Sequence, residues 1–144
     1  MSERYLGGFV SLSFNPLGTQ TSSYSNSLYT WGSNSVGQIG DNTTVNKSSP
    51  VQVGSLTNWG TISNGQYQVL SVKTDNTLWV WGINNFGQLG ITSRVNKSSP
   101  VQVGALTNWL QSTSNYSQSG AVKTDGTLWM WGRSEEHTSE LQSH

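Results

Sequence analysis

The sequence predicts an all-β fold, namely part of a β-propeller built from four-stranded blades of about 50 residues each. Residues 31–80 align with residues 81–130 without a gap, and 28 of the 50 aligned positions are identical. Apolar residues alternate over short runs that Gly, Asn, Asp and Pro interrupt, which is typical of several short strands. The seven tryptophans follow the same spacing of 50 residues, at positions 31, 59, 79, 81, 109, 129 and 131.

Four strands are expected in each period. The first is expected at residues 51–53, directly after Pro50, because proline is accepted at the first residue of a strand or on a sheet edge but not inside a ladder. The next three are predicted at residues 59–63, 68–73 and 77–81. Asp75-Asn76 joins the last two strands, and Asp125-Gly126 does so one period later; both pairs accept the positive φ of a tight hairpin turn.

Bulky side chains are expected on both faces of the last strand of each period. Side chains alternate along a strand, so Trp79 and Trp81 share one face while Leu78 and Val80 share the other. A strand of this kind must be covered on both faces. A four-stranded unit cannot do this alone, and packing between neighbouring blades of a propeller provides the cover.

A glycine-rich motif carries a family resemblance. The pattern Trp-Gly-x-Asn-x-x-Gly-Gln-(Ile/Leu)-Gly occupies residues 31–40 and 81–90, and a third copy begins at Trp131-Gly132. Together with Ser-Ser-Pro-Val-Gln-Val and Lys-Thr-Asp-(Gly/Asn)-Thr-Leu-Trp, it resembles the regulator of chromosome condensation repeats over roughly residues 20–132. The resemblance implies a seven-bladed propeller of which this chain is a fragment, and the near-identical copies look most similar to bacterial or phage members.

The repeat organisation divides the chain into four parts. Residues 1–28 form a degenerate partial blade, residues 29–78 the first repeat, and residues 79–132 the second repeat with the start of a third. Residues 133–144, Arg-Ser-Glu-Glu-His-Thr-Ser-Glu-Leu-Gln-Ser-His, depart abruptly from the repeat and resemble the translated read-through of a sequencing adapter. We therefore interpret them as a non-native tail, the alternative being a natural helical tail.

Composition disfavours several classes of function. Seven Lys and Arg balance seven Asp and Glu, so no basic field is available to attract nucleic acid or an anionic membrane. No apolar run approaches the ~20 residues of a membrane span. The chain has no cysteine, and both histidines, His137 and His144, lie in the adapter-like tail. Most catalytic triads, zinc sites and acid-base pairs are thereby excluded, so we expect no enzyme activity, metal or cofactor in this segment.

Two sets of residues allow both a functional and a structural interpretation. Asp75 and Asp125 form a possible pair of catalytic carboxylates, but they are one turn position repeated in two blades, which favours a turn role. Trp59 and Trp109 are alternatively surface contacts, since aromatic side chains are enriched in binding patches. The remaining strand tryptophans are expected in the core.

Binding is the expected function of the complete propeller. Identical positions maintain the blade, while differing positions are free to specialise, and these cluster at residues 41–44 against 91–94 and at 60–71 against 110–121. The candidate binding residues are Asp41, Asn42, Asn85 and Arg94. The expected partner is a protein or a glycan, next to the remaining blades of the same propeller. The alternatives are guanine-nucleotide exchange on a small GTPase, which the resemblance alone implies, and a propeller enzyme whose catalytic residues lie in other blades.

Overall fold

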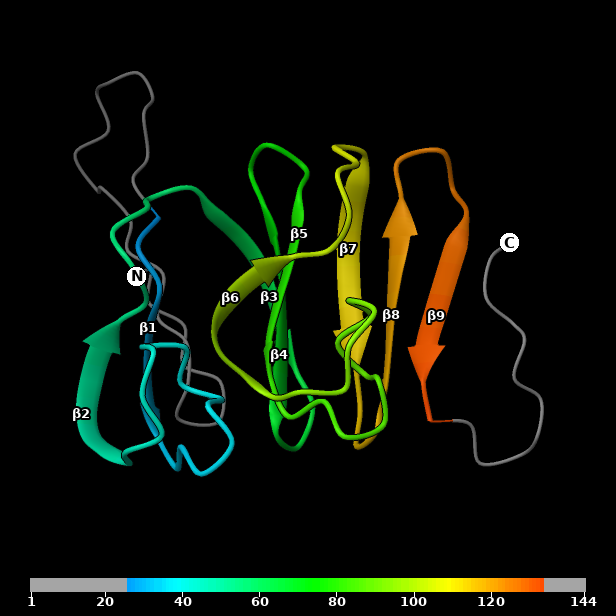
Figure 1. Ribbon diagram of the computed structural model, residues 1–144. Helices are drawn as coiled ribbons and strands as arrows, with labels where there is room; N and C mark the ends of the chain where they lie inside the picture. The colour runs from blue at the N-terminus through cyan, green and yellow to red at the C-terminus, as the bar shows by residue number, and fades with distance from the viewer. Residues whose placement is uncertain (1–25, 134–144) are drawn as a thin grey trace, which may run out of the picture.

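The computed structural model describes residues 26–133, and within this range the chain forms nine strands and no helix (Figure 1). The strands are β1 (Tyr29–Gly32), β2 (Lys47–Gln52), β3 (Trp59–Asn64), β4 (Gln68–Lys73), β5 (Leu78–Gly82), β6 (Lys97–Gln102), β7 (Trp109–Ser114), β8 (Gln118–Lys123) and β9 (Leu128–Gly132). The predicted all-β class is confirmed. The predictions for the first 25 residues and for the adapter-like tail from residue 134 lie outside the described residues.

The strands form three antiparallel sheets in chain order. They are β1-β2, β3-β4-β5-β6 and β7-β8-β9, and Figure 1 shows them side by side along the molecule. Strand β7 packs against β3 and β4 of the preceding sheet. Successive sheets are therefore stacked face to face, as consecutive blades of a propeller are.

The later strands of each period were placed correctly from the sequence, but the strand near Pro50 was not. It begins at Lys47, so Pro50 lies inside β2, and Pro100 lies inside β6 in the same way. Both strands are sheet edges among the described residues, and an edge strand tolerates the missing N–H. The expected strand order was also wrong, because β6 does not open the next blade: it pairs with β5 and completes the sheet that precedes it.

Side chains on both faces of β5 are buried, as the alternation along this strand predicted. Leu78 and Val80 are fully buried in a cluster that includes Trp109 of the following sheet. On the opposite side, Trp81 packs with Leu28 at the start of the first sheet. Complete burial of a Leu or Val side chain contributes about 1.5–3 kcal/mol, so contacts between sheets supply much of the stability of each sheet.

The alternative that Trp59 and Trp109 are surface contacts is wrong. Their exposed fractions are 1% and 4%. Trp59 meets the ring of Trp81 edge to face, with centroids 5.7 Å apart, and Trp109 meets the rings of Trp129 and Trp131 in the same way at 6.5 Å. These tryptophans begin the first strand of their sheets, and edge-to-face contacts of this kind add to the energy of burial.

An indole N–H joins the second sheet to the first, and another joins the third sheet to the second, among other bonds between the sheets. The Nε1–H of Trp81 donates to the carbonyl of Gln38 at 3.0 Å, and that of Trp131 donates to the carbonyl of Gln88 at 2.9 Å. Gly40, whose φ is +82°, lies directly against the ring of Trp81, and a Cβ there would come within 2.7 Å of Nε1. The glycine-rich motif therefore provides the contact surface for the tryptophan of the next sheet. We call this surface, formed by Gln38 and Gly40 in the first loop and by Gln88 and Gly90 in the second, the tryptophan seat.

We predict that Gly40→Ala destabilises the protein more than Gly54→Ala. Both glycines have positive φ, but a Cβ on Gly54 would meet nothing within 4 Å. Gly54→Ala should cost about 1 kcal/mol of backbone strain. Gly40→Ala should cost a further 1–3 kcal/mol or so, because it overpacks the Trp81 seat. Urea unfolding followed by tryptophan fluorescence gives both values, and equal losses would contradict the proposed seat.

Candidate functional site

The four candidate residues lie on two long loops that fold in the same way, residues 33–46 between β1 and β2 and residues 83–96 between β5 and β6. A fully buried asparagine organises each loop. In the second loop, the Nδ2 of Asn84 donates to the carbonyls of Ser93 (2.8 Å) and Val95 (3.1 Å), and its Oδ1 accepts the N–H of Leu89 (2.9 Å). Asn34 makes the equivalent bonds in the first loop. The backbone of each loop is therefore held in place by hydrogen bonds to its buried asparagine side chain.

Asp41 is engaged within its own loop. Its carboxylate accepts the hydroxyl of Thr43 at 2.6 Å and forms an ion pair with Lys47 at 3.1 Å. Desolvation raises the pKa of Asp41, but the hydrogen bonds from Thr43 and Lys47 outweigh it and hold the pKa below its ordinary value of 3.8. The carboxylate therefore has a structural role, and Ile91 replaces it at the equivalent position of the second loop.

The other three candidates have different surroundings. The backbone N–H of Asn42 donates to the carbonyl of Ser98 on β6 at 2.7 Å, which ties the loop to the next sheet, while the Asn42 side chain is exposed. Asn85 is exposed, and its Oδ1 accepts a hydrogen bond from Gln88 at 3.4 Å. Arg94 is exposed on the rim of an open depression of about 520 Å³. Binding by any of these residues stays a prediction.

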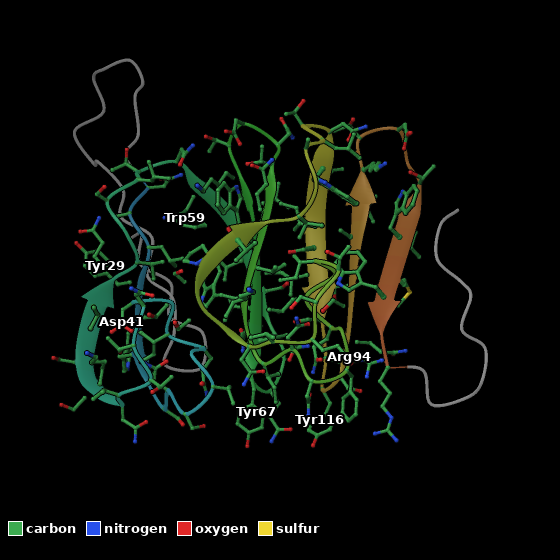
Figure 2. The ribbon with its side chains drawn as sticks, viewed as in Figure 1. Tyr29, Asp41, Trp59, Tyr67, Arg94 and Tyr116 are labelled. Carbon is green, nitrogen blue, oxygen red and sulfur yellow. The ribbon has the colours of Figure 1, made fainter. Side chains whose placement is uncertain are left out.

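The structure does not gather the four candidates into one cluster. Asp41 and Asn42 belong to the loop of the first sheet, and Asn85 and Arg94 belong to the loop of the second. Figure 2 shows Asp41 beside β1 and β2, whereas Arg94 lies across the molecule, toward the last sheet. They are therefore separate surface positions on successive loops.

Two tyrosines that the sequence analysis did not name are the exposed aromatic side chains of this end of the molecule. Tyr67 lies in the β3–β4 turn with an exposed fraction of 36%, and Tyr116 lies in the β7–β8 turn with 62%. Figure 2 shows both at the same end of the sheets, which is also the end toward which Arg94 lies. We call Gln66, Tyr67, Asn115 and Tyr116 the tyrosine surface; all four are exposed.

The two turns are held to each other and to the sheets. Gln68 is fully buried, and its Nε2 donates to the carbonyl of Asn115 at 2.8 Å, which links the turn of one sheet to the turn of the next. The carbonyl of Tyr67 accepts the N–H of Ile83 at 2.9 Å. The backbone beneath the tyrosines is therefore fixed, because a buried hydrogen-bond partner is costly to lose.

One sequence signal pointed toward these tyrosines. Both fall in residues 60–71 and 110–121, where the two copies differ most. In the alignment Gln66 stands opposite Tyr116, and Tyr67 stands opposite Ser117, so neither tyrosine recurs at the repeat spacing. Only the packing of one turn against the other places the two rings on one surface.

The carboxylates of the hairpin turns are occupied by local hydrogen bonds. Asp75 accepts the hydroxyl of Thr77 at 2.6 Å, and Asp125 accepts that of Thr127 at 2.7 Å. This confirms the turn interpretation. Within residues 26–133 no group of three or more His, Cys, Asp or Glu side chains lies close enough together to hold a metal ion. The same residues form no helix that is long and apolar enough to cross a membrane.

A lysine is stacked between two tryptophans in each complete hairpin. The Nζ of Lys73 lies 4.5 Å from the ring centroid of Trp59 and 3.8 Å from that of Trp79, and Lys123 lies 5.2 Å and 4.2 Å from Trp109 and Trp129. Burial lowers the pKa of Lys73, and the charge of Asp75 opposes this shift. Because the arrangement recurs at the same position of two sheets, we assign it to the architecture.

Comparison with known proteins agrees with this architecture. A family model described as the regulator of chromosome condensation (RCC1) repeat matches residues 25–72 and 75–122, which is two thirds of the chain. The chain belongs to the RCC1 repeat family. No curated protein sequence gives a significant match to it.

Solved RCC1-type structures show the same fold. Human WBSCR16 is 22% identical with a TM-score of 0.70, and the match covers 92% of this chain and 34% of that one. Prp20p from Saccharomyces cerevisiae is 24% identical with a TM-score of 0.64, and the match covers 76% of this chain and 27% of that one. Yeast RCC1 (Prp20) bound to Kap60 is 20% identical with a TM-score of 0.62, and the match covers 81% of this chain and 32% of that one. The RCC1-repeat chain thus spans about a third or less of each of these proteins, and it is part of a β-propeller.

We predict that Asn84→Asp destabilises the protein strongly while Asn85→Asp does not. The aspartate at position 84 would keep one acceptor but could not donate to the carbonyls of Ser93 and Val95. Leaving such buried groups unpaired should cost about 2–4 kcal/mol. The exposed neighbour Asn85 should tolerate the same change within about 0.5 kcal/mol. Urea unfolding measures both, and similar losses at the two positions would show that the Asn84 side chain does not organise the loop.

We also predict that Asp41 contributes stability that depends on pH. Its pKa is lower in the folded protein than its ordinary value of 3.8, so the contribution is present above about pH 4 and is lost as the pH falls through the folded value. Asp41→Asn should therefore be less stable than the parent chain at pH 7, and the difference in free energy of unfolding should shrink below about pH 4. Asp75 and Asp125 titrate in both the parent chain and the variant, so their contributions cancel in the difference between the two free energies of unfolding. A difference that stays constant with pH would contradict this.

Proposed function

We propose that the chain is part of a rigid scaffold that binds a protein partner, and that the tyrosine surface makes the contact. The observation that carries the proposal is the pair of exposed rings, Tyr67 and Tyr116, on two adjacent turns that Gln68 links. Tyrosine supplies a large contact area with both apolar and hydrogen-bonding character at low entropic cost. Aromatic residues are accordingly enriched in protein interfaces.

The fixed backbone favours binding energetically. Association loses less conformational entropy when the contacting turns are already ordered, so more of the contact energy remains as affinity. The buried bond from Gln68 to Asn115 and the bond from Ile83 to Tyr67 supply this order. The tyrosine surface itself contains no charged residue, so it offers no basic patch to attract a nucleic acid.

The relatives support a protein partner over the glycan that the sequence left open. The Prp20p structure is described with binding to Gsp1p and histones, and yeast RCC1 (Prp20) is described bound to Kap60. All of these partners are proteins. No described residue specifically favours guanine-nucleotide exchange, and we assign no catalytic step to residues 26–133.

A photo-crosslinking amino acid in place of Tyr67 or Tyr116 tests the proposal in extract from the source of the chain. Control positions are Leu56 and Leu106, which are 50% and 46% exposed and lie in the β2–β3 and β6–β7 connections, at the opposite end of the sheets. We expect one protein to be crosslinked from positions 67 and 116 and not from 56 or 106. Crosslinking from all four positions, or from the controls alone, would reject the tyrosine surface.

The purified crosslinked partner then allows a quantitative measurement. The double variant Tyr67→Ser/Tyr116→Ser should bind at least about tenfold more weakly by calorimetry, since loss of central aromatic contacts costs more than 1 kcal/mol each. The double variant Leu56→Ser/Leu106→Ser removes equally exposed apolar side chains from the opposite end and should bind as the parent chain does. Unchanged affinity of the tyrosine variant would contradict the proposal.

A further inference from the structure

The main-chain groups of the two turns that carry the tyrosine surface are used within the protein. The carbonyl of Tyr67 accepts the N–H of Ile83 at 2.9 Å, and the N–H of Gly65 donates to the carbonyl of Gln68 at 2.9 Å. The carbonyl of Asn115 accepts the Nε2 of Gln68 at 2.8 Å. A ligand strand added at these turns would find these groups occupied, so recognition by strand addition is disfavoured here.

The side chains of the tyrosine surface offer hydrogen-bond donors instead. The Oδ1 of Asn115 accepts the N–H of Gln118 at 3.1 Å, whereas its Nδ2 has no acceptor among residues 26–133. The exposed hydroxyls of Tyr67 and Tyr116 are further donors. Figure 2 shows both tyrosine side chains pointing away from the sheets at this end. The surface therefore fits a ligand that presents carbonyl groups beside apolar rings.

Charge at this end narrows the class of ligand. The two turn regions, residues 60–71 and 110–121, and the loop of residues 83–96 contain one charged side chain, Arg94. These segments have no carboxylate to pair with a basic ligand and no cluster of arginines to bind a phosphorylated one. The ligand segment is therefore expected to be uncharged.

We propose that the tyrosine surface binds a proline-rich segment of the protein partner in the polyproline II conformation. This inference rests on the proposed function and specifies which part of the partner makes the contact. Proline has no N–H, so it needs no acceptor from the turns. The polyproline II backbone makes no internal hydrogen bonds, so its carbonyls accept from Asn115 and from the tyrosine hydroxyls. Its rings pack on Tyr67 and Tyr116, as such segments pack in aromatic-lined grooves.

Both sides of this contact are ordered before they meet. A polyproline II segment is already extended in solution, because each proline ring fixes φ. The two turns are in direct contact, since a Cβ on Gly65 would collide with the carbonyl of Asn115. Little conformational entropy is therefore lost on binding, which allows a short uncharged segment to bind measurably.

Fluorescein-labelled octaproline tests the site on the complete chain. We expect saturable binding with a Kd below about 1 mM by fluorescence anisotropy. The matched control is the same peptide with two central D-prolines, which interrupt the left-handed helix without changing the composition; it should bind at least about tenfold more weakly. Binding should hardly change with salt concentration, because no ion pair forms.

Variants of the tyrosine surface locate the binding site. Tyr67→Ser and Tyr116→Ser should each weaken octaproline binding at least about fivefold, because each removes an aromatic contact. Tyr67→Phe keeps the ring and should lose less. Asn115→Asp keeps the acceptor that holds Gln118 but removes the Nδ2 donor, and it should also weaken binding about fivefold. Leu56→Ser, at the opposite end of the sheets, should bind octaproline as the parent chain does.

Several results would overturn the polyproline assignment. They are the absence of saturable binding at about 1 mM octaproline, equal binding of the D-proline peptide, and binding that neither tyrosine variant weakens. A protein crosslinked from positions 67 and 116 that octaproline does not displace would also overturn it, while leaving the proposed function in place. Octaproline binding that requires both tyrosines supports the assignment even where no protein is captured, and in that case the proposed function alone is contradicted.

Discussion

The rest of the structure depends on the seating of one tryptophan ring on the glycine-rich loop of the sheet before it. The ring needs a carbonyl to accept its N–H and a residue without a Cβ beneath it, and Gln38 with Gly40 provides both for Trp81. The loop keeps this shape because Asn34 bonds its backbone from within. The motif therefore encodes one physical contact, and the contact repeats at 50 residues because each sheet must present both the ring and the next seat.

The contact between each tryptophan and the preceding loop explains which positions of the repeat vary. Positions that form the tryptophan seat are fixed by contact with the next sheet, and Asn34, Gln38 and Gly40 recur as Asn84, Gln88 and Gly90. The turns after β3 and β7 are held by main-chain groups, through the bonds from Gln68 to Asn115 and from Ile83 to Tyr67, so their exposed side chains are free to differ. Tyr67 and Tyr116 occupy this free part. A surface that differs from blade to blade on an invariant frame is how repeat proteins obtain specificity.

Much of the fold could be predicted from the sequence because its determinants are local or periodic. Alternation identified the two faces of β5, and the Asp75 turn identified its hairpin. The extent of β2 and the pairing of β6 could not be predicted, since β6 reaches β5 only through the long loop that Asn84 folds. The candidate residues depend on less. Variation between the copies suggested Asp41, whose carboxylate bonds within its own loop, while the offset between Tyr67 and Tyr116 concealed a surface that only packing creates.

Because every contact between sheets joins one repeat to the next, stability in this architecture is shared along the chain rather than held by single sheets. Leu78 and Val80 are completely buried by the sheet that follows, whereas Leu128 and Met130, at the same positions of β9, are 41% and 37% exposed. Burial of such side chains is worth a few kcal/mol per sheet. Among residues 26–133, burial by a neighbouring sheet therefore stabilises the side chains of β5 more than those of β9.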